Sequence, residues 1–168
     1  VIMRISDMMI SFPGMVLAIA VAGIMGASVK NAVIAVAVVS WAQFTKIIRT
    51  KVMAIKALPY IEAAKIYGES DLSIIVRYVL PNLVSTIIVL ATLAMPSAIL
   101  STTSMGFLGL GAQQPLPDWG WILQNGIQYI KKAAWISMAP GLAIVWTVLS
   151  FNLVGEGVKE LLDPRTRV

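Results

Sequence analysis

Four long stretches of this chain contain no charged side chain, and they limit what the chain can fold into. They are 22, 15, 40 and 23 residues long and cover positions 8–29, 31–45, 78–117 and 133–155. A helix that crosses a bilayer needs roughly 20 apolar residues, and the shortest stretch can be extended if Lys46 reaches the interface with its ammonium group. The sequence therefore predicts membrane-spanning helices at 8–26, 31–48, 79–101 and 137–155.

The alternative, a soluble protein with an apolar core, conflicts with the composition. Only 12% of the residues are charged and 58% are hydrophobic, whereas an average soluble domain is about a quarter charged. Too few charged side chains remain to cover a soluble fold. We therefore predict an all-α, polytopic transmembrane helical bundle that forms one domain over residues 1–168. Val1 is not an initiator methionine and no signal-like segment follows it, so we expect the bundle to be N-terminally incomplete.

Basic residues concentrate between the second and third predicted spans. Six of them lie there: Lys46, Arg49, Lys51, Lys56, Lys65 and Arg77. Cytoplasmic loops of membrane proteins carry an excess of lysine and arginine. We therefore predict that loop 49–77 and both ends of the chain are cytoplasmic and that segment 102–136 is extracytoplasmic. The lipid bilayer around the spans is expected to be the cell (inner or plasma) membrane.

Loop 49–77 contains the signals of a short helix with a second helix directly behind it. Pro59 suits a first helical turn, and Glu62 lies near the positive end of that helix's dipole. Gly68 predicts the stop, and Ser70 predicts the cap of the next helix. The loop is thus expected to present a compact helical element.

The side chains of this short helix favour a docking role. Ala63, Ala64 and Gly68 are small, so another surface could approach the backbone, while Ile61 and Ile66 would supply apolar contact. The alternative is an ordinary surface helix whose alanines only raise helix propensity. Spacing alone leaves both interpretations open.

The same loop carries a longer motif. Its residues are Glu62, Ala63 and Ala64, then Gly68, and finally Leu80 and Pro81. The spacing resembles the Glu-Ala-Ala loop of the membrane permease subunits of ABC importers, although Tyr78 stands where that family usually has an aliphatic residue. In that family the loop is a coupling helix that fits a cleft on the ATP-hydrolysing subunit. The resemblance implies ATPase-coupling roles for Tyr60, Ile61, Glu62, Ala63, Ala64, Lys65 and Gly68.

Three further places match the dipeptide, oligopeptide and nickel branch of these permeases, which have the MetI-like fold. They are Met3-Arg4 to Asp7 with Phe12-Pro13, Phe107-Leu108-Gly109-Leu110-Gly111 with Trp119-Gly120, and Leu162-Asp163-Pro164-Arg165. Together with the loop motif they cover nearly the whole chain. Many relatives carry a glutamate where this chain has Thr102, and this departure weakens the assignment to peptides.

The third predicted span offers the best indication of a translocation path. Pro96 near its outer end, followed by four hydroxyl residues, marks a kinked or broken helix end. Backbone freed in a membrane is tolerated only where protein or a water-filled cavity covers it. The path residues would be Pro96, Ser101, Thr102, Thr103 and Ser104, although a proline kink without function is the alternative.

Beyond this span, Asp118 is expected to cap a helix over 119–132 at the outer interface.

The sequence contains no arrangement that would support catalysis. All eight carboxylates lie at or beyond the predicted span ends, where none is paired with a base or nucleophile, and there is no phosphate-binding Gly-x-x-x-x-Gly-Lys-Ser/Thr loop. The absence of Cys and His excludes the usual soft or imidazole metal sites, so neither a metal nor a cofactor is expected. If transport is powered by ATP, the nucleotide site is therefore on another polypeptide.

The resemblance implies a permease subunit of an ATP-driven importer for peptides or nickel. Its partners would be cytoplasmic ATP-binding subunits, a second, homologous permease subunit and an extracytoplasmic substrate-binding protein. Nucleic acid is not expected, because the net charge of +5 belongs to the loops of a membrane protein. The alternatives are a channel or scaffold without ATP coupling, and an importer branch for amino acids or metals.

Overall fold

The computed structural model of the protein describes residues 1–162, and every regular element within this range is a helix. The elements are α1 (Ile2–Ile10), α2 (Gly14–Met25), α3 (Val29–Lys56), α4 (Pro59–Ile66), α5 (Asp71–Ile74), the π-helical turn η1 (Ile75–Val79), α6 (Leu80–Phe107), α7 (Trp119–Gly126), the 3₁₀ turn η2 (Ile127–Tyr129) and α8 (Trp135–Leu162). The motif residues Asp163, Pro164 and Arg165 lie outside the described part of the chain.

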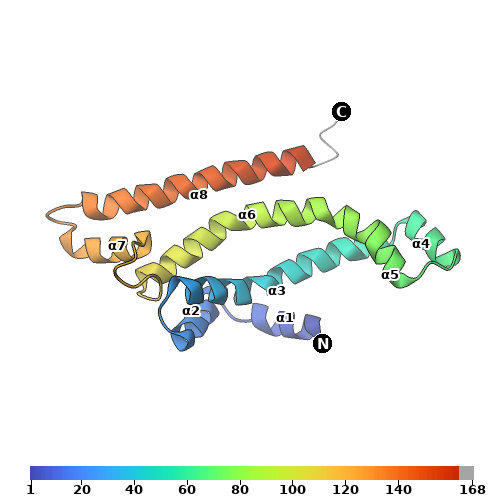
Figure 1. Ribbon diagram of the computed structural model, residues 1–168, viewed down its shortest axis with the longest axis horizontal. Coiled ribbons are helices and arrows are strands. Elements are labelled where there is room, and N and C mark those ends of the chain that lie inside the picture. The colour runs from blue at the N-terminus through green and yellow to red at the C-terminus, as the bar shows by residue number, and fades with distance from the viewer. Residues whose placement is uncertain (163–168) are drawn as a thin grey trace.

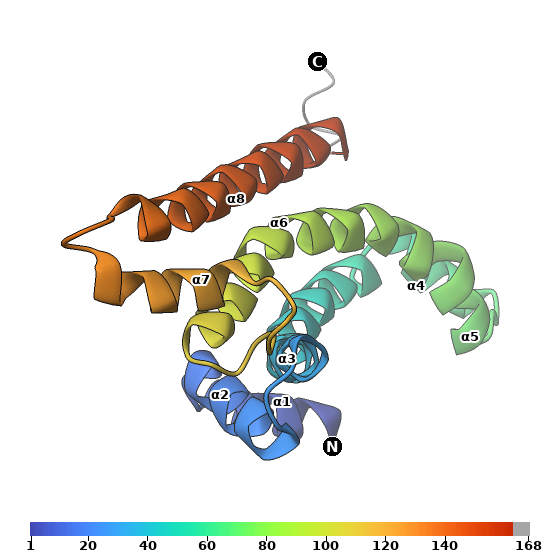
Figure 2. The same cartoon turned by 60° about the vertical axis from the view of Figure 1, so that its left-hand side comes forward.

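Three long helices form the body of the molecule. α3, α6 and α8 have 28 residues each, which corresponds to about 42 Å at 1.5 Å per residue. Each is long and apolar enough to cross a membrane, and α5, η1 and α6 form one continuous helical run. α6 lies between α3 and α8, while α4 and α7 lie toward opposite ends of the molecule (Figures 1 and 2).

The first predicted span is divided into two helices at Pro13. α1 ends at Ile10, and α2 begins directly after the proline. The two helices are bent by 101° relative to each other, and together they could form a fourth span. Pro13 has a ψ angle of 116°, outside the helical range, and a new helix begins after it.

The contact between α2, α3 and the end of α6 joins alanines of α2 and α3 to one large side chain of α6. Its buried members are Ala18, Ala22, Ala32, Ala35 and Met105. Alanine allows helix backbones to approach closely, which is how membrane helices associate when the surrounding lipid is as apolar as they are. Many large apolar side chains of α6 and α8 remain exposed, as expected of surfaces that face lipid.

A kinked or broken helix end was expected near residues 101–104, and the break is wrong, because α6 continues through Pro96 to Phe107. The helix curves but does not break (Figure 1). Pro96 cannot donate to the carbonyl of Thr92, four residues earlier. Gly155 of α8 lies against that carbonyl, since a Cβ atom added to Gly155 would be 3.5 Å from the Thr92 oxygen. Neighbouring protein therefore covers the freed backbone group, and the helix can continue.

The segment after α6 folds back onto the end of that helix. Asp118 caps α7 by accepting a hydrogen bond of 3.2 Å from the Gly120 amide, which confirms the predicted cap. A Cβ atom on Gly106 would overlap the Asp118 carboxylate, so the loop packs directly against the helix backbone. α7 ends at Gly126, and only the turn η2 follows, so the predicted helix over 119–132 is too long. Gly126 contacts Ser137 at the start of α8, where the chain reverses.

Candidate docking helix and membrane groove

The short helix α4 forms as its sequence predicts. Pro59 occupies its first turn, and Gly68 ends it with a φ angle of +80°, which only glycine adopts without strain. The amide of Glu69 donates to the carbonyl of Ala64 at 3.1 Å, which closes the helix end. Ser70 then caps α5 by accepting a hydrogen bond from the Ser73 amide at 3.3 Å. Both the predicted stop and the predicted new cap are therefore confirmed.

One face of α4 holds the helix to the rest of the chain. Ile61 is fully buried and Ala64 is 6% exposed. Their buried cluster also contains Ile74, Val79 and Leu83, and partly buried side chains of α3 complete it. The expectation that Ile61 offers apolar contact to another surface is wrong for this structure, because Ile61 seats α4 between the ends of α3 and α6.

The other face of α4 is open. Glu62, Lys65 and Gly68 are exposed, Ala63 is half-buried, and Tyr60 is 42% exposed. Ile66 and two residues that the sequence reasoning missed, Tyr67 and Leu72, are 85%, 87% and 72% exposed. The sequence did contain a signal for Tyr67 and Leu72, because both are large apolar residues in a loop outside the long apolar stretches. Contact with lipid cannot explain exposed apolar side chains in such a loop. We call this set the outer α4 face.

A groove of about 610 Å³ runs between α3 and α6. Its polar lining residues are Ser40, Gln43, Ser97, Ser101 and Thr102. A smaller groove of about 250 Å³ beside α2 shares the first four of these residues. The predicted path residues are thus divided, because Thr103 and Ser104 line an apolar recess against α7 and α8, and Pro96 is buried.

Ser40, Gln43 and Ser97 were missed by the sequence reasoning. The signal was available for two of them, since Ser40 and Gln43 are polar residues three positions apart in a predicted span and therefore share a helix face. Within residues 1–162, the side chains of Ser40, Gln43, Ser97 and Ser101 form no hydrogen bond, whereas Thr102 donates to the carbonyl of Ala98 at 2.9 Å. The groove thus displays free donors and acceptors without any charged side chain.

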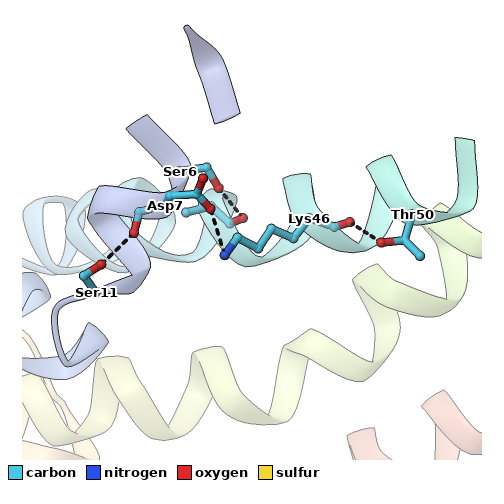
Figure 3. A network of polar contacts seen from close by, with 6 residues as sticks. Ser6, Asp7, Ser11, Lys46 and Thr50 are labelled. Carbon is cyan, nitrogen blue, oxygen red and sulfur yellow. Dashed lines mark hydrogen bonds and ion pairs between the residues drawn. The ribbon is translucent and has the colours of Figure 1, made fainter. Parts of the chain in front are cut away.

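Polar contacts fasten α1 to α3 (Figure 3). The buried hydroxyl of Ser6 donates to the carbonyl of Ala42 in α3 at 2.8 Å, and the carboxylate of Asp7 pairs with the ammonium group of Lys46 at 2.9 Å. Among the described residues, no group of three His, Cys, Asp or Glu side chains could hold a metal ion.

The protein is thus an apolar bundle of helices with one short helix, α4, packed at its end and a groove with polar side chains between α3 and α6. The profile of the family described as "Binding-protein-dependent transport system inner membrane component" matches residues 1–168. The chain belongs to this family. Membership in this family confirms the resemblance to ABC importer permeases and the all-α fold. It also makes the protein a multi-pass membrane protein.

Individual relatives of this permease family agree. The chain is similar to the dipeptide transport system permease protein DppC of Alkalihalophilus pseudofirmus, with 43% identity over 166 residues, and to the glutathione transport system permease protein GsiD of Shigella flexneri, with 42% identity over 166 residues. It is also 42% identical over 167 residues to GsiD of Pectobacterium atrosepticum. These matches cover 99% of the chain but 55% or 56% of each relative, so the chain spans about half the length of the curated relatives it matches.

Proposed function

We propose that this chain is part of the permease of an ATP-driven peptide importer and that α4 couples it to a separate ATPase. The observation that carries the proposal is the two-sided character of α4. One face is anchored on α3 and α6, and the other presents exposed apolar and charged side chains beyond the long apolar stretches. A helix built in this way can receive a push from a partner and pass it to the membrane helices.

The charge distribution supports a cytoplasmic position for α4. Basic residues surround it, including Arg49, Lys51, Lys56, Lys65 and Arg77, and positive charge favours the cytoplasmic side. In this orientation α7 faces the extracytoplasmic side, and the chain starts and ends in the cytoplasm. The proposed spans remain 8–26, 31–48, 79–101 and 137–155, with the first of them bent at Pro13.

The groove between α3 and α6 supports the proposed translocation path. Polar groups without partners are costly in lipid, so Ser40, Gln43, Ser97 and Ser101 require water, substrate or another protein chain opposite them. A second, homologous permease subunit would close the groove, and an extracytoplasmic binding protein would deliver substrate to it. Peptides are favoured over nickel because the relatives are described as dipeptide and glutathione permeases.

The test is a crosslink from α4 to the ATPase in the assembled transporter. The chain has no cysteine, so single cysteines can be introduced at two adjacent alanines that face opposite ways. Ala63→Cys lies toward the outer α4 face, and Ala64→Cys is the matched control because Ala64 is buried against the chain itself. We expect the first variant to crosslink to a cysteine in the ATPase's docking cleft with a yield that changes on ATP binding, and the control not to crosslink.

The channel or scaffold alternative predicts a different result. Without ATP coupling, the ATPase would not associate with the permease, and Ala63→Cys would give no nucleotide-dependent product. Equal crosslinking from Ala64→Cys would also contradict the proposal, because α4 would then have to leave its seat.

A further inference from the structure

A set of hydrogen bonds surrounds the junction between α4 and α6. Glu69, in the turn after α4, is half-buried, and hydroxyl groups occupy both of its carboxylate oxygens. The Tyr78 hydroxyl donates to Oε1 at 3.0 Å, and the Ser73 hydroxyl donates to Oε2 at 2.9 Å. Glu69 therefore ties the turn after α4 to η1 through Tyr78 and to α5 through Ser73.

Tyr78 has two further contacts, and they reach the helices on either side of it. Its backbone carbonyl accepts a hydrogen bond of 2.7 Å from the side-chain amide of Asn82 in α6. Its ring lies against the ring of Tyr60 in α4, with centroids 6.0 Å apart and planes inclined by 43°. Asn82 also approaches the Tyr60 hydroxyl at 3.4 Å. Hydroxyl, ring and carbonyl of Tyr78 thus contact three different segments of the chain.

The backbone at this junction needs such support. Pro81 lacks an N–H and disturbs the helical bonding that precedes it. The chain accommodates it with the π-helical turn η1, in which the amide of Leu80 donates to the carbonyl of Ile75, five residues earlier. A π-turn interrupts the regular α-helical bonding, and such turns are frequent at functional sites. Without support from side chains, the helical run from α5 to α6 would bend most easily at η1. That is the part of the run to which movement of α4 would be transmitted.

The hydrogen bonds fix the orientation of α4, which its apolar contacts alone cannot do. The cluster around Ile61 and Leu83 holds α4 against the chain, but apolar contact is not directional. Hydrogen bonds depend on angle, so the Glu69, Tyr78 and Asn82 contacts fix the orientation of α4 relative to α6. Ser97 of the groove lies 19 residues beyond Tyr78 on the same helical run, about 28 Å along its axis.

We propose that Tyr78 is a positioning residue that makes α4, η1 and α6 move as one body, so that movement of α4 is transmitted to the groove. The inference rests on the proposed ATPase coupling. It assigns a role to a residue that departs from the family's loop pattern. Loss of the Tyr78 hydroxyl would leave the ATPase docked, but more ATP would be hydrolysed for each peptide imported. The reason is that the π-turn would deform when α4 moved, and α6 would not follow.

The experiment uses the full-length permease assembled with its second permease, ATPase and binding protein in proteoliposomes, and it measures ATP hydrolysed per peptide imported. Tyr78→Phe removes the hydroxyl and keeps the ring, and Glu69→Ala removes its acceptor. We expect each variant to raise the ratio about fivefold, the scale of one hydrogen bond. Glu69→Ala also loses the hydrogen bond from Ser73, so the double variant should be no worse than Glu69→Ala alone, in which the contact with Tyr78 is already absent.

Two controls separate this proposal from general damage. Tyr129→Phe is the matched substitution at an exposed tyrosine of η2 and should leave the ratio unchanged. The Ala63→Cys crosslink, introduced into the Tyr78→Phe background, should keep its wild-type yield, since docking itself is intact. Loss of that crosslink would overturn the inference, because Tyr78 would then act on the shape of α4.

An unchanged ratio in Tyr78→Phe, or additive effects of the two single substitutions, would also overturn it. Failure of the proposed function has a different signature. In that case the wild-type protein itself would show no nucleotide-dependent crosslink, whatever the ratio in the variants.

Discussion

At Gly120 the first turn of α7 touches the last turns of α6 with no side chain between them. A Cβ atom at this position would overlap the Thr103 carbonyl and lie 2.7 Å from the amide nitrogen of Phe107. Both neighbours are backbone atoms and cannot rotate away. We therefore expect Gly120→Ala to lower the free energy of unfolding by about 1–3 kcal/mol, measured by thermal unfolding of the detergent-solubilised permease.

Gly23→Ala is the matched control for this substitution. Gly23 also lies in a helix, but nothing stands within 4 Å of the place where its Cβ would be. Alanine has the higher helix propensity, so this variant should be as stable as the wild type or more stable. Equal losses at the two positions would mean that the close contact between α7 and α6 contributes little.

At the scale of elements, α1 tests whether packing or charge holds a peripheral helix. Ser6→Val places a larger side chain where Ser6 is completely buried and removes its hydrogen bond to the Ala42 carbonyl, which together should cost about 1–3 kcal/mol. Asp7→Asn removes an ion pair whose side chains are 44% and 53% exposed, and such pairs contribute about 0–1 kcal/mol. The unfolding midpoint should therefore fall further for Ser6→Val, and the reverse order would show that the pair with Lys46 is the main attachment.

The elements that sequence predicts best are those governed by local chemistry. Pro59, Gly68 and Asp118 act on their own backbone or on the next turn, so the start of α4, its end and the cap of α7 were all predictable. The continuation of α6 past Pro96 was not, because it depends on Gly155, which is 59 positions away in sequence.

The candidate sites divide along the same line. The exposed and buried faces of α4 follow from its contacts with α3 and α6, so a sequence motif that groups Glu62 with Ala64 cannot separate the two faces. Likewise, residues 101–104 read as one polar cluster, but helical geometry points successive side chains in different directions. Ser101 and Thr102 thus reach the groove, while Thr103 and Ser104 face α7 and α8.

For the whole molecule, the groove and the outer surface of α8 should differ in hydration. Ser97 lines the groove, whereas Leu149 is 53% exposed on α8, where lipid is the expected neighbour. In right-side-out and inside-out membranes, we expect a water-soluble thiol reagent to label Ser97→Cys and not Leu149→Cys. Equal protection of both cysteines would show that the groove is closed to water and does not form a path.

The contact between Gly155 and Thr92 also decides how closely two long helices can approach. Thr92 lies near the middle of α6, whose ends are Leu80 and Phe107. A Cβ atom on Gly155 would lie 3.1 Å from the side chain of Leu93, so a larger residue there would have to separate α8 from α6. The missing side chain at residue 155 therefore lets α8 lie against α6 at the point where Pro96 leaves a backbone carbonyl without its usual donor.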